Sequence, residues 1–240
     1  MKVSDVLQRV DNPLEATAAQ IATPRTTELE RVEVAHLPAV ATSRVKIAMD
    51  VVLATVGLIV LLPSLLLIGL FVCLDSRWPP LYSQRRVGLN GRTFRMWKFR
   101  TMVNGADGLR EQLMSLNEAP FPAFKLRRDP RVTRVGRFLR KTSIDELPQL
   151  WNVLTGDMSL VGPRPALPGE VEHYDTVARR RLRARPGLTC IWQIESRHRS
   201  GGGFDQWLEQ DIDYINRWSM GLDVELIAKS VREVVRMSGH

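Results

Sequence analysis

The strongest constraint in this sequence is an almost purely apolar run of 24 residues from Val51 to Leu74. A straight helix of that length measures about 36 Å at about 1.5 Å per residue. The hydrocarbon core of a bilayer is about 30 Å thick. The simplest interpretation is therefore a single helix that crosses a membrane.

Two features of the same segment favour a helix that enters the bilayer and returns. Pro63, in the middle of the run, lacks the N–H that would bond the carbonyl of Ile59, and so favours a break. Both ends are basic, whereas the positive-inside rule gives a crossing helix one cytoplasmic end. The flanking basic residues are Arg44, Lys46, Arg77, Arg85 and Arg86. We predict a re-entrant membrane anchor over 43–76, broken at Pro63, with a kinked crossing helix as the open alternative.

An acidic residue at the start of the anchor needs a partner or water. Asp50 precedes the apolar run by one residue, where an acid is costly unless it is paired. Lys46 stands four residues earlier and can pair with it on a helix. The alternative is that Asp50 lies at the level of the lipid headgroups.

The charge balance of the whole chain narrows the choice of partners. The net formal charge of +8 favours an anionic partner: nucleic acid, an acidic membrane surface or a phosphorylated substrate. The two cysteines, Cys73 and Cys190, are too far apart to suggest a disulfide framework, which suits a reducing compartment. The four histidines have no zinc-binding spacing.

The rest of the chain divides into a polar extension and a domain of soluble character. Residues 1–42 are polar and rich in proline and threonine, and we expect them to be mostly disordered. Residues 77–240 contain a hairpin signal at 81–102 around Asn90–Gly91, and helical patterns near 106–117, from 136, and over 204–237 with a break near Gly221. This predicts an α+β fold that is mainly helical with a small β-hairpin or sheet.

The segment 140–165 carries the densest chemical signal. Asp145 and Glu146 are adjacent acids, and Pro148 suits the first turn of a helix, so the acids lie at or just before a helix N-terminus. Such an end attracts anions through its free N–H groups. The competing interpretation is structural, because Ser143 and Glu146 have the spacing of a capping box.

Cations surround this acidic pair. Residues 125–141 contain one acid, Asp129, and eight basic residues: Lys125, Arg127, Arg128, Arg131, Arg134, Arg137, Arg140 and Lys141. This composition suits a diphosphate and a divalent cation that share a site, with one carboxylate on Mg²⁺ and the other attacking phosphorus. Asp157 is either a second metal ligand or a helix cap. Arg164, in the stiff Gly162–Pro165 loop, either faces the site or is solvated.

Three segments resemble the bacterial sugar transferase family, the polyprenyl-phosphate phosphoglycosyl transferases with a monotopic membrane anchor. They are KFRTM (98–102), DPRVTRVGRFLRKTSIDELPQLWNVLTGDMSLVGPRP (129–165) and RPGLTCIWQI (185–194), within a resemblance that covers about residues 44–236. The resemblance implies that an aspartate attacks a UDP-sugar in an Mg²⁺-dependent reaction and UMP leaves. Polyprenyl (undecaprenyl) phosphate then takes the sugar-1-phosphate from the covalent intermediate, as the first membrane step of exopolysaccharide or glycoconjugate assembly.

The resemblance also assigns roles to individual residues. It implies that Asp145 is the nucleophile, that Glu146 and, less directly, Asp157 bind Mg²⁺, and that phosphate or nucleotide contacts come from the basic residues Lys98, Arg140, Arg164 and Arg197. It places the catalytic domain 77–240, with interfacial amphipathic helices, on the cytoplasmic face of the bacterial inner membrane. Membrane lipid is an expected partner, nucleic acid is not, and self-association into a homo-oligomer stays open.

Two further classes compete with this transferase. A membrane-tethered nucleic-acid-binding protein would explain the positive charge, but not the acids inside the basic cluster. A non-catalytic scaffold with the same fold would have lost the Asp145–Glu146 pair, which this chain keeps. Within the enzyme class, a direct single displacement without a covalent intermediate stays open.

Overall fold

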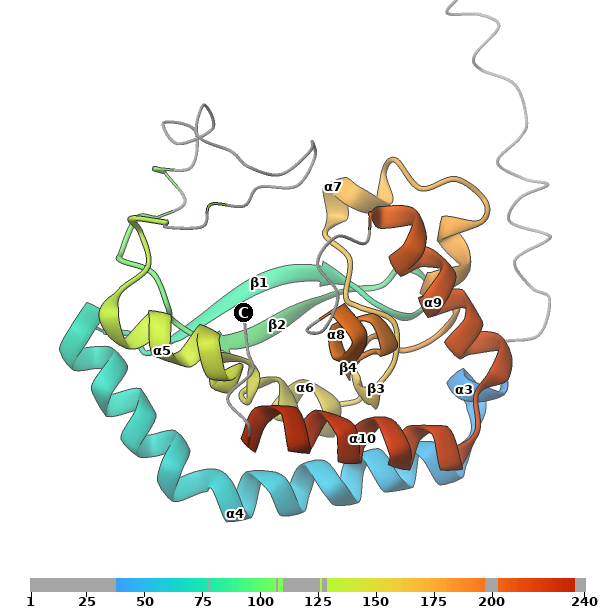
Figure 1. Ribbon diagram of the computed structural model, residues 1–240, viewed down its shortest axis with the longest axis horizontal. Coiled ribbons are helices and arrows are strands. Elements are labelled where there is room, and N and C mark those ends of the chain that lie inside the picture. Colours follow the sequence, from blue (N-terminus) through green and yellow to red (C-terminus); the bar gives the residue numbers. More distant parts are fainter. Residues whose placement is uncertain are drawn as a thin grey trace, which may run out of the picture. The chain divides into compact units, whose positions relative to one another are not determined.

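The computed structural model describes residues 38–76, 78–106, 108–109, 126, 129–196 and 203–235. The expected extension over 1–37, most of the helix expected near 106–117, and Arg197 lie outside the described residues. Within them the fold is mainly helical with a small amount of sheet, as the sequence predicts (Figure 1).

The segment predicted to be a membrane anchor is one continuous helix, α4 (Arg44–Ser76), with Pro63 inside it. It is long and apolar enough to cross a membrane. The predicted break at Pro63 into two helices is wrong, although α4 bends along its length (Figure 1). A proline removes one helical hydrogen bond. In apolar surroundings the remaining N–H and C=O groups of the helix have no water to bond, so the helical bonds around the missing one persist.

The predicted hairpin is confirmed. Strands β1 (Leu81–Val87) and β2 (Thr93–Phe99) pair antiparallel, with Leu81 opposite Phe99 and Val87 opposite Thr93. The connection contains the short 3-10 turn η3 (Leu89–Gly91), in which Asn90 and Gly91 both have positive φ. Asparagine and glycine are the residues that adopt this left-handed conformation at least cost.

A second, smaller sheet was not predicted. Strands β3 (Ser159–Val161) and β4 (Gly187–Thr189) pair in parallel. Gly162 and Gly187 bring the two backbones together, since a Cβ on Gly187 would lie 2.1 Å from the Gly162 nitrogen. Only glycine fits at this contact, which fixes the loop that begins at Gly162 against the segment that leads into β4.

Short helices connect these strands, and two longer ones end the described chain. The break between the last two falls at Trp218–Ser219, so Gly221 belongs to the last helix rather than to the break. The remaining helical elements are α3 (Ala39–Thr42), α5 (Arg134–Thr142), η5 (Ile144–Glu146), α6 (Gln149–Leu154), α7 (Pro168–Val171), η6 (Ala178–Arg183), α8 (Ile191–Ser196), α9 (Phe204–Arg217) and α10 (Met220–Val235).

The main hydrophobic core joins the anchor to these elements. Helix α6 lies between α4 and the β1–β2 hairpin (Figure 1), and Leu226 of α10 belongs to the same core as Ala54 of α4. The buried core side chains come from every layer: Val40, Ala54, Phe94, Met96, Leu150, Val153, Met158, Val161, Ile215 and Leu226. Because Val40 in α3 is part of this core, the folded region begins earlier than the boundary expected at residue 42.

A buried polar network fastens the start of α4. Lys46 Nζ lies 2.6 Å from Asp223 Oδ2 of α10, and 3.8 Å from Asp50 Oδ2. Asp223 also accepts hydrogen bonds from the Tyr214 hydroxyl at 2.7 Å and from Trp218 Nε1 at 3.0 Å. Asp50 is buried rather than solvated at a headgroup level. It accepts from the hydroxyl of Ser159 at 2.7 Å and from the Leu160 amide at 3.1 Å.

Replacement of Asp223 by alanine is expected to destabilise the protein by about 3–5 kcal/mol. It leaves the buried Lys46 ammonium with only the more distant Asp50 and removes the acceptor of Tyr214 and Trp218. Thermal unfolding in detergent measures the change. Glu225→Ala is the matched control, since it removes a carboxylate from the same helix. Its pair with Lys229 is exposed on both sides, and such pairs contribute at most about 1 kcal/mol. Equal stability of the two variants would show that the network does not hold α4 in place.

Candidate active site

The two adjacent acids lie in the short turn η5, between α5 and α6. Ser143 ends α5 with a positive φ of 57° and makes no capping hydrogen bond with its side chain. The interpretation of Ser143 and Glu146 as a capping box is therefore wrong. Pro148 precedes α6 directly, as expected, but α6 has only six residues. The anion-binding character of the site therefore depends on its basic side chains rather than on the N-terminus of α6.

Lys98 and Glu146 form the closest ion pair of the site. Lys98 Nζ, on β2, lies 2.6 Å from Glu146 Oε1, and 23 % of each side chain remains exposed. The strand places Lys98 here because its neighbour Phe99 is buried, so successive side chains face opposite sides. The pair brings two sequence-predicted site residues together across 48 positions of the chain.

Arg140 reaches the same region from α5. Its Nε donates a hydrogen bond to the Thr101 hydroxyl at 2.8 Å, and its charge acts on Asp145. Gly136 allows this approach, because a Cβ there would lie 2.1 Å from the Thr101 carbonyl oxygen. Helix α5 therefore packs directly on the backbone that follows β2, which holds Arg140 beside the acids.

Asp145 differs from Glu146 in its environment. It is buried, with 9 % exposed, and makes no salt bridge within 4 Å among the described residues. Burial, followed by the neighbouring charge of Glu146, raises the pKa of Asp145 to about 6, although Lys98 and Arg140 act in the opposite direction. The carboxylate is thus ionised near neutral pH yet poorly solvated, which suits a nucleophile.

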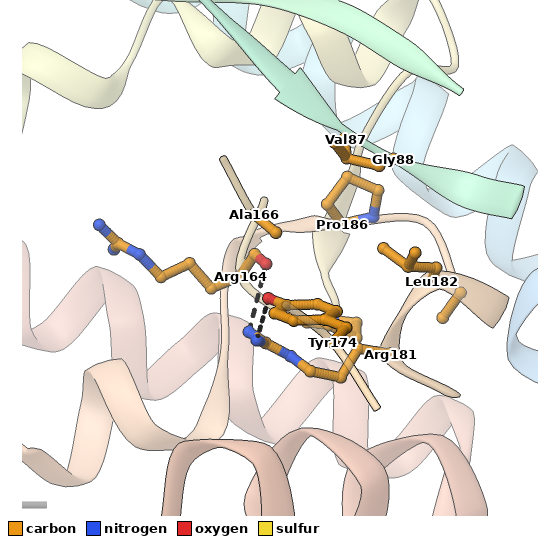
Figure 2. A pocket seen from close by; sticks show the side chains of 10 residues that line it. Val87, Gly88, Arg164, Ala166, Tyr174, Arg181, Leu182 and Pro186 are labelled. Carbon is orange, nitrogen blue, oxygen red and sulfur yellow. Dashed lines mark hydrogen bonds between the residues drawn. The ribbon is translucent and has the colours of Figure 1, made fainter. Parts of the chain in front are cut away.

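Two buried arginines hold the loop that carries Arg164. Arg86 Nη1 donates to the Pro165 carbonyl at 3.0 Å, and Arg181 Nη2 donates to the Arg164 carbonyl at 3.4 Å. The Arg164 side chain points away from Tyr174 and Arg181 (Figure 2), and its guanidinium lies 5.3 Å from the centre of the Trp192 ring. It is neither fully solvated nor paired with an acid among the described residues. The cavity behind the loop, about 10 Å³, has room for no more than a water molecule.

The structure does not bring Asp157 to the acidic pair. Asp157 follows the C-terminal end of α6, whereas Asp145 and Glu146 precede its N-terminal end, and its Oδ2 accepts from the Thr155 hydroxyl at 3.3 Å. No group of three or more Asp, Glu, His or Cys in the described part of the chain gathers as a metal site. Mg²⁺ in phosphoryl-transfer sites typically takes one or two carboxylates and phosphate oxygens. The Asp145–Glu146 pair fits that requirement without Asp157.

Sequence reasoning missed several residues that shape the site. Thr101 lies inside the KFRTM segment and Arg86 in the basic flank of the predicted anchor, and neither segment by itself indicates a role for them in the site. The pair of Arg181 Nη2 with Asp211 Oδ2, at 2.7 Å, joins residues 30 positions apart. No local pattern marks such contacts, because each depends on how distant elements pack.

The family is decided by comparison with known proteins. A model described as bacterial sugar transferase matches residues 41–237. The chain belongs to the bacterial sugar transferase family. This confirms the resemblance seen in the three sequence segments.

Individual relatives of this transferase are similar over most of its length. It is 40 % identical to the exopolysaccharide production protein ExoY of Sinorhizobium fredii over 198 residues, which cover 81 % of the chain and 87 % of ExoY. It is 42 % identical over 204 residues to a UDP-glucose:undecaprenyl-phosphate glucose-1-phosphate transferase of Caulobacter vibrioides, covering 81 % of the chain and 71 % of that protein. It is 46 % identical to the galactosyl transferase CpsE of Streptococcus agalactiae over 161 residues, covering 67 % of the chain but only 36 % of CpsE.

The raised pKa of Asp145 leads to a prediction about the pH at which this carboxyl loses its proton. Asp145 is expected to lose its proton near pH 6, and Glu146→Gln is expected to lower that midpoint because it removes a neighbouring negative charge. The folded pKa lies above the unfolded value of about 3.9. The stability that Asp145 contributes is therefore complete below about pH 4 and is lost as the pH rises through about 6. Carbon-13 NMR of labelled aspartate measures the midpoint, with Asp145→Asn to assign the signal. A midpoint at or below about 4 would contradict the prediction.

Proposed function

We propose that this transferase moves a sugar-1-phosphate from a UDP-sugar to polyprenyl phosphate and releases UMP, through a covalent intermediate on Asp145. The observation that carries the proposal is the different state of the two acids. Glu146 is engaged by Lys98, whereas Asp145 is buried beside cations with no ion pair among the described residues. Undecaprenyl phosphate is named as the acceptor of the Caulobacter relative.

The proposed reaction has two displacements at the same phosphorus. A carboxylate oxygen of Asp145 attacks the phosphorus that bears the sugar, and the bond from this phosphorus to the bridging oxygen breaks as UMP leaves. A phosphate oxygen of the polyprenyl carrier then attacks the same phosphorus and returns Asp145 as a carboxylate. Neither step needs a proton from Asp145, which agrees with its being ionised near neutral pH. Lys98, Arg140 and Arg164 offset the charge on the phosphoryl oxygens.

Mg²⁺ is part of the proposal. Glu146 would hold it, with Asp145 adjacent, and the ion would lower the negative charge of the diphosphate when bound. Lys98 already neutralises Glu146, so the Lys98 side chain is expected to turn toward phosphate when the ion binds. Asp157 is not included, since it lies at the other end of α6.

We further propose that α4 enters and leaves the membrane on the cytoplasmic side of the bacterial inner membrane. Both of its ends bond to the same domain, Lys46 to Asp223 and Asp75 Oδ2 to the Val135 amide at 2.8 Å. The middle of the helix, by contrast, exposes large apolar side chains such as Ile59, Val60 and Leu66. Exposed Phe138, Trp151, Val224 and Val231 on α5, α6 and α10 would lie at the lipid interface, as interfacial helices require.

The donor and pathway follow from the relatives as proposals. The name of CpsE specifies galactosyl transfer, and that of the Caulobacter relative specifies glucose-1-phosphate. UDP-glucose and UDP-galactose are therefore the first donors to test. ExoY is named for exopolysaccharide production, and the first membrane step of such a pathway is the role proposed here.

Asp145→Asn is expected to abolish UMP release while keeping the fold, because it removes the nucleophile and preserves the side-chain shape. UMP is measured with protein in nanodiscs, Mg²⁺, undecaprenyl phosphate and either UDP-glucose or UDP-galactose. Asp213→Asn, on the surface of α9, is the matched control and should retain activity. Without acceptor, the intact mass of the wild type should rise by one sugar phosphate. Substantial turnover by Asp145→Asn would refute the covalent role, and no release by folded wild type from any UDP-sugar would refute the function.

The anchor geometry is tested with single cysteines in a background that carries both Cys73→Ser and Cys190→Ser. Val45→Cys and Trp78→Cys, at exposed positions near the two ends of α4, should both react with an impermeant maleimide added to the cytoplasmic side of inside-out vesicles. Leu66→Cys, in the exposed apolar middle, is the control that lipid should protect. Labelling of the two ends from opposite sides would show a crossing helix.

A further inference from the structure

Arg86 is a buried cation that lacks an acidic partner. Only 8 % of its surface is exposed, and no carboxylate in the described part of the chain pairs with it. Nη1 donates to the Pro165 carbonyl at 3.0 Å and Nη2 to Gln84 Oε1 at 2.7 Å, while Nε has no hydrogen-bond partner. A buried charge is costly unless it is paired, so this arrangement needs an explanation beyond packing.

Two other buried arginines show what a structural arginine looks like in this protein. Arg181 uses Nε, at 2.8 Å, and Nη2, at 2.7 Å, to bind Asp211 Oδ2. Arg131 uses the same two nitrogens to bind Asp129. This edge of a guanidinium matches carboxylate and phosphate geometry. In Arg86 the same edge carries only the neutral amide oxygen of Gln84.

The contacts of Arg86 connect its Nε–Nη2 edge with the candidate site. Through Pro165 it holds the loop of Arg164, and the charges that act on it come from Arg164, Glu170 and Glu146. Burial, and after it the charge of Arg164, lower the pKa of Arg86 to about 10, so it stays protonated at neutral pH. The charge of Arg164 acts on Arg86, and no carboxylate in the described part of the chain forms an ion pair with either guanidinium, so a bound anion would be favoured beside them.

We propose that Arg86 is an additional anion-binding residue of the site, whose Nε–Nη2 edge binds a phosphate group of the nucleotide-sugar donor. A phosphate oxygen would replace Gln84 Oε1, because a charged acceptor bonds more strongly than a neutral amide. Arg86 would then bind the donor between the Lys98–Glu146 pair and Arg164. The identity of the ligand rests on the proposed function; the presence of an anion site does not.

The test measures binding of inorganic pyrophosphate to the full-length protein by calorimetry, beside UMP release from UDP-glucose and UDP-galactose. Arg86→Gln is expected to weaken pyrophosphate binding by about 10- to 100-fold, as expected for loss of a hydrogen bond between charged groups. Arg86→Lys, which keeps the charge but loses the planar edge, is expected to fall between Arg86→Gln and wild type. Arg85→Gln is the matched control: it removes one charge from an exposed neighbour on the same strand and should bind normally.

A second variant tests the edge without removing the arginine. Gln84→Glu keeps the side-chain shape and supplies an internal carboxylate, so it should match or exceed the wild-type melting temperature while weakening pyrophosphate binding. It alters the net charge by the same amount as Arg85→Gln. It also decides the question if Arg86→Gln fails to fold. Wild-type affinity in folded Gln84→Glu, or in folded Arg86→Gln, would overturn the proposal. Pyrophosphate binding that depends on Arg86, without UMP release from any UDP-sugar, would leave the anion site standing while the proposed function fails.

Discussion

The buried ion pair between Lys46 and Asp223 is the contact on which the rest of the structure depends. Lys46 lies closer to Asp223, at 2.6 Å, than to Asp50, at 3.8 Å, so the pair within α4 that the sequence suggests is the weaker of the two. Loss of one partner from a buried pair is far more costly than its formation is favourable. The pair therefore selects one register of α4 on α10 rather than adding much net stability.

That register reaches the active site through β3. Asp50 binds the Ser159 hydroxyl and the Leu160 amide, and β3 leads directly into the Gly162–Pro165 loop. The loop then takes its direction from the close contact of Gly162 with Gly187 and from the arginines bonded to its carbonyls. Helix α4 and Arg164 are thus joined by a short series of buried polar contacts. A change in the seating of α4 is expected to move Arg164 as well as the anchor.

How much of the fold and of the candidate site follows from the sequence depends on how far apart in the chain the contacting residues are. The β1–β2 hairpin was predictable because Asn90 and Gly91 accept positive φ and the flanking residues alternate. The acidic pair was found because it is contiguous. The parallel β3–β4 pair, the Lys46–Asp223 bridge across 177 positions and the continuity of α4 through Pro63 were not predicted. The first two are decided by burial and packing between distant segments, which periodicity does not encode, and the third by backbone hydrogen bonds that persist on both sides of the proline. Asp157 shows the opposite error. It is close to Asp145 and Glu146 in the sequence, but α6 separates it from them in the structure.

The cations of this protein separate into two groups by the kind of partner they have. Arg131 and Arg181 bind carboxylates and stabilise the fold. Around the candidate site the partners are neutral: the Thr101 hydroxyl for Arg140, the Trp192 ring for Arg164, and Gln84 with the Pro165 carbonyl for Arg86. Neutral partners orient a guanidinium without forming an ion pair with it, so these three arginines stay available to a multiply charged ligand. Lys98 is the exception, and its partner Glu146 is the carboxylate to which we assign Mg²⁺. An ion bound there would release Lys98 from Glu146. When the donor binds, Lys98 would then contact phosphate together with the arginines.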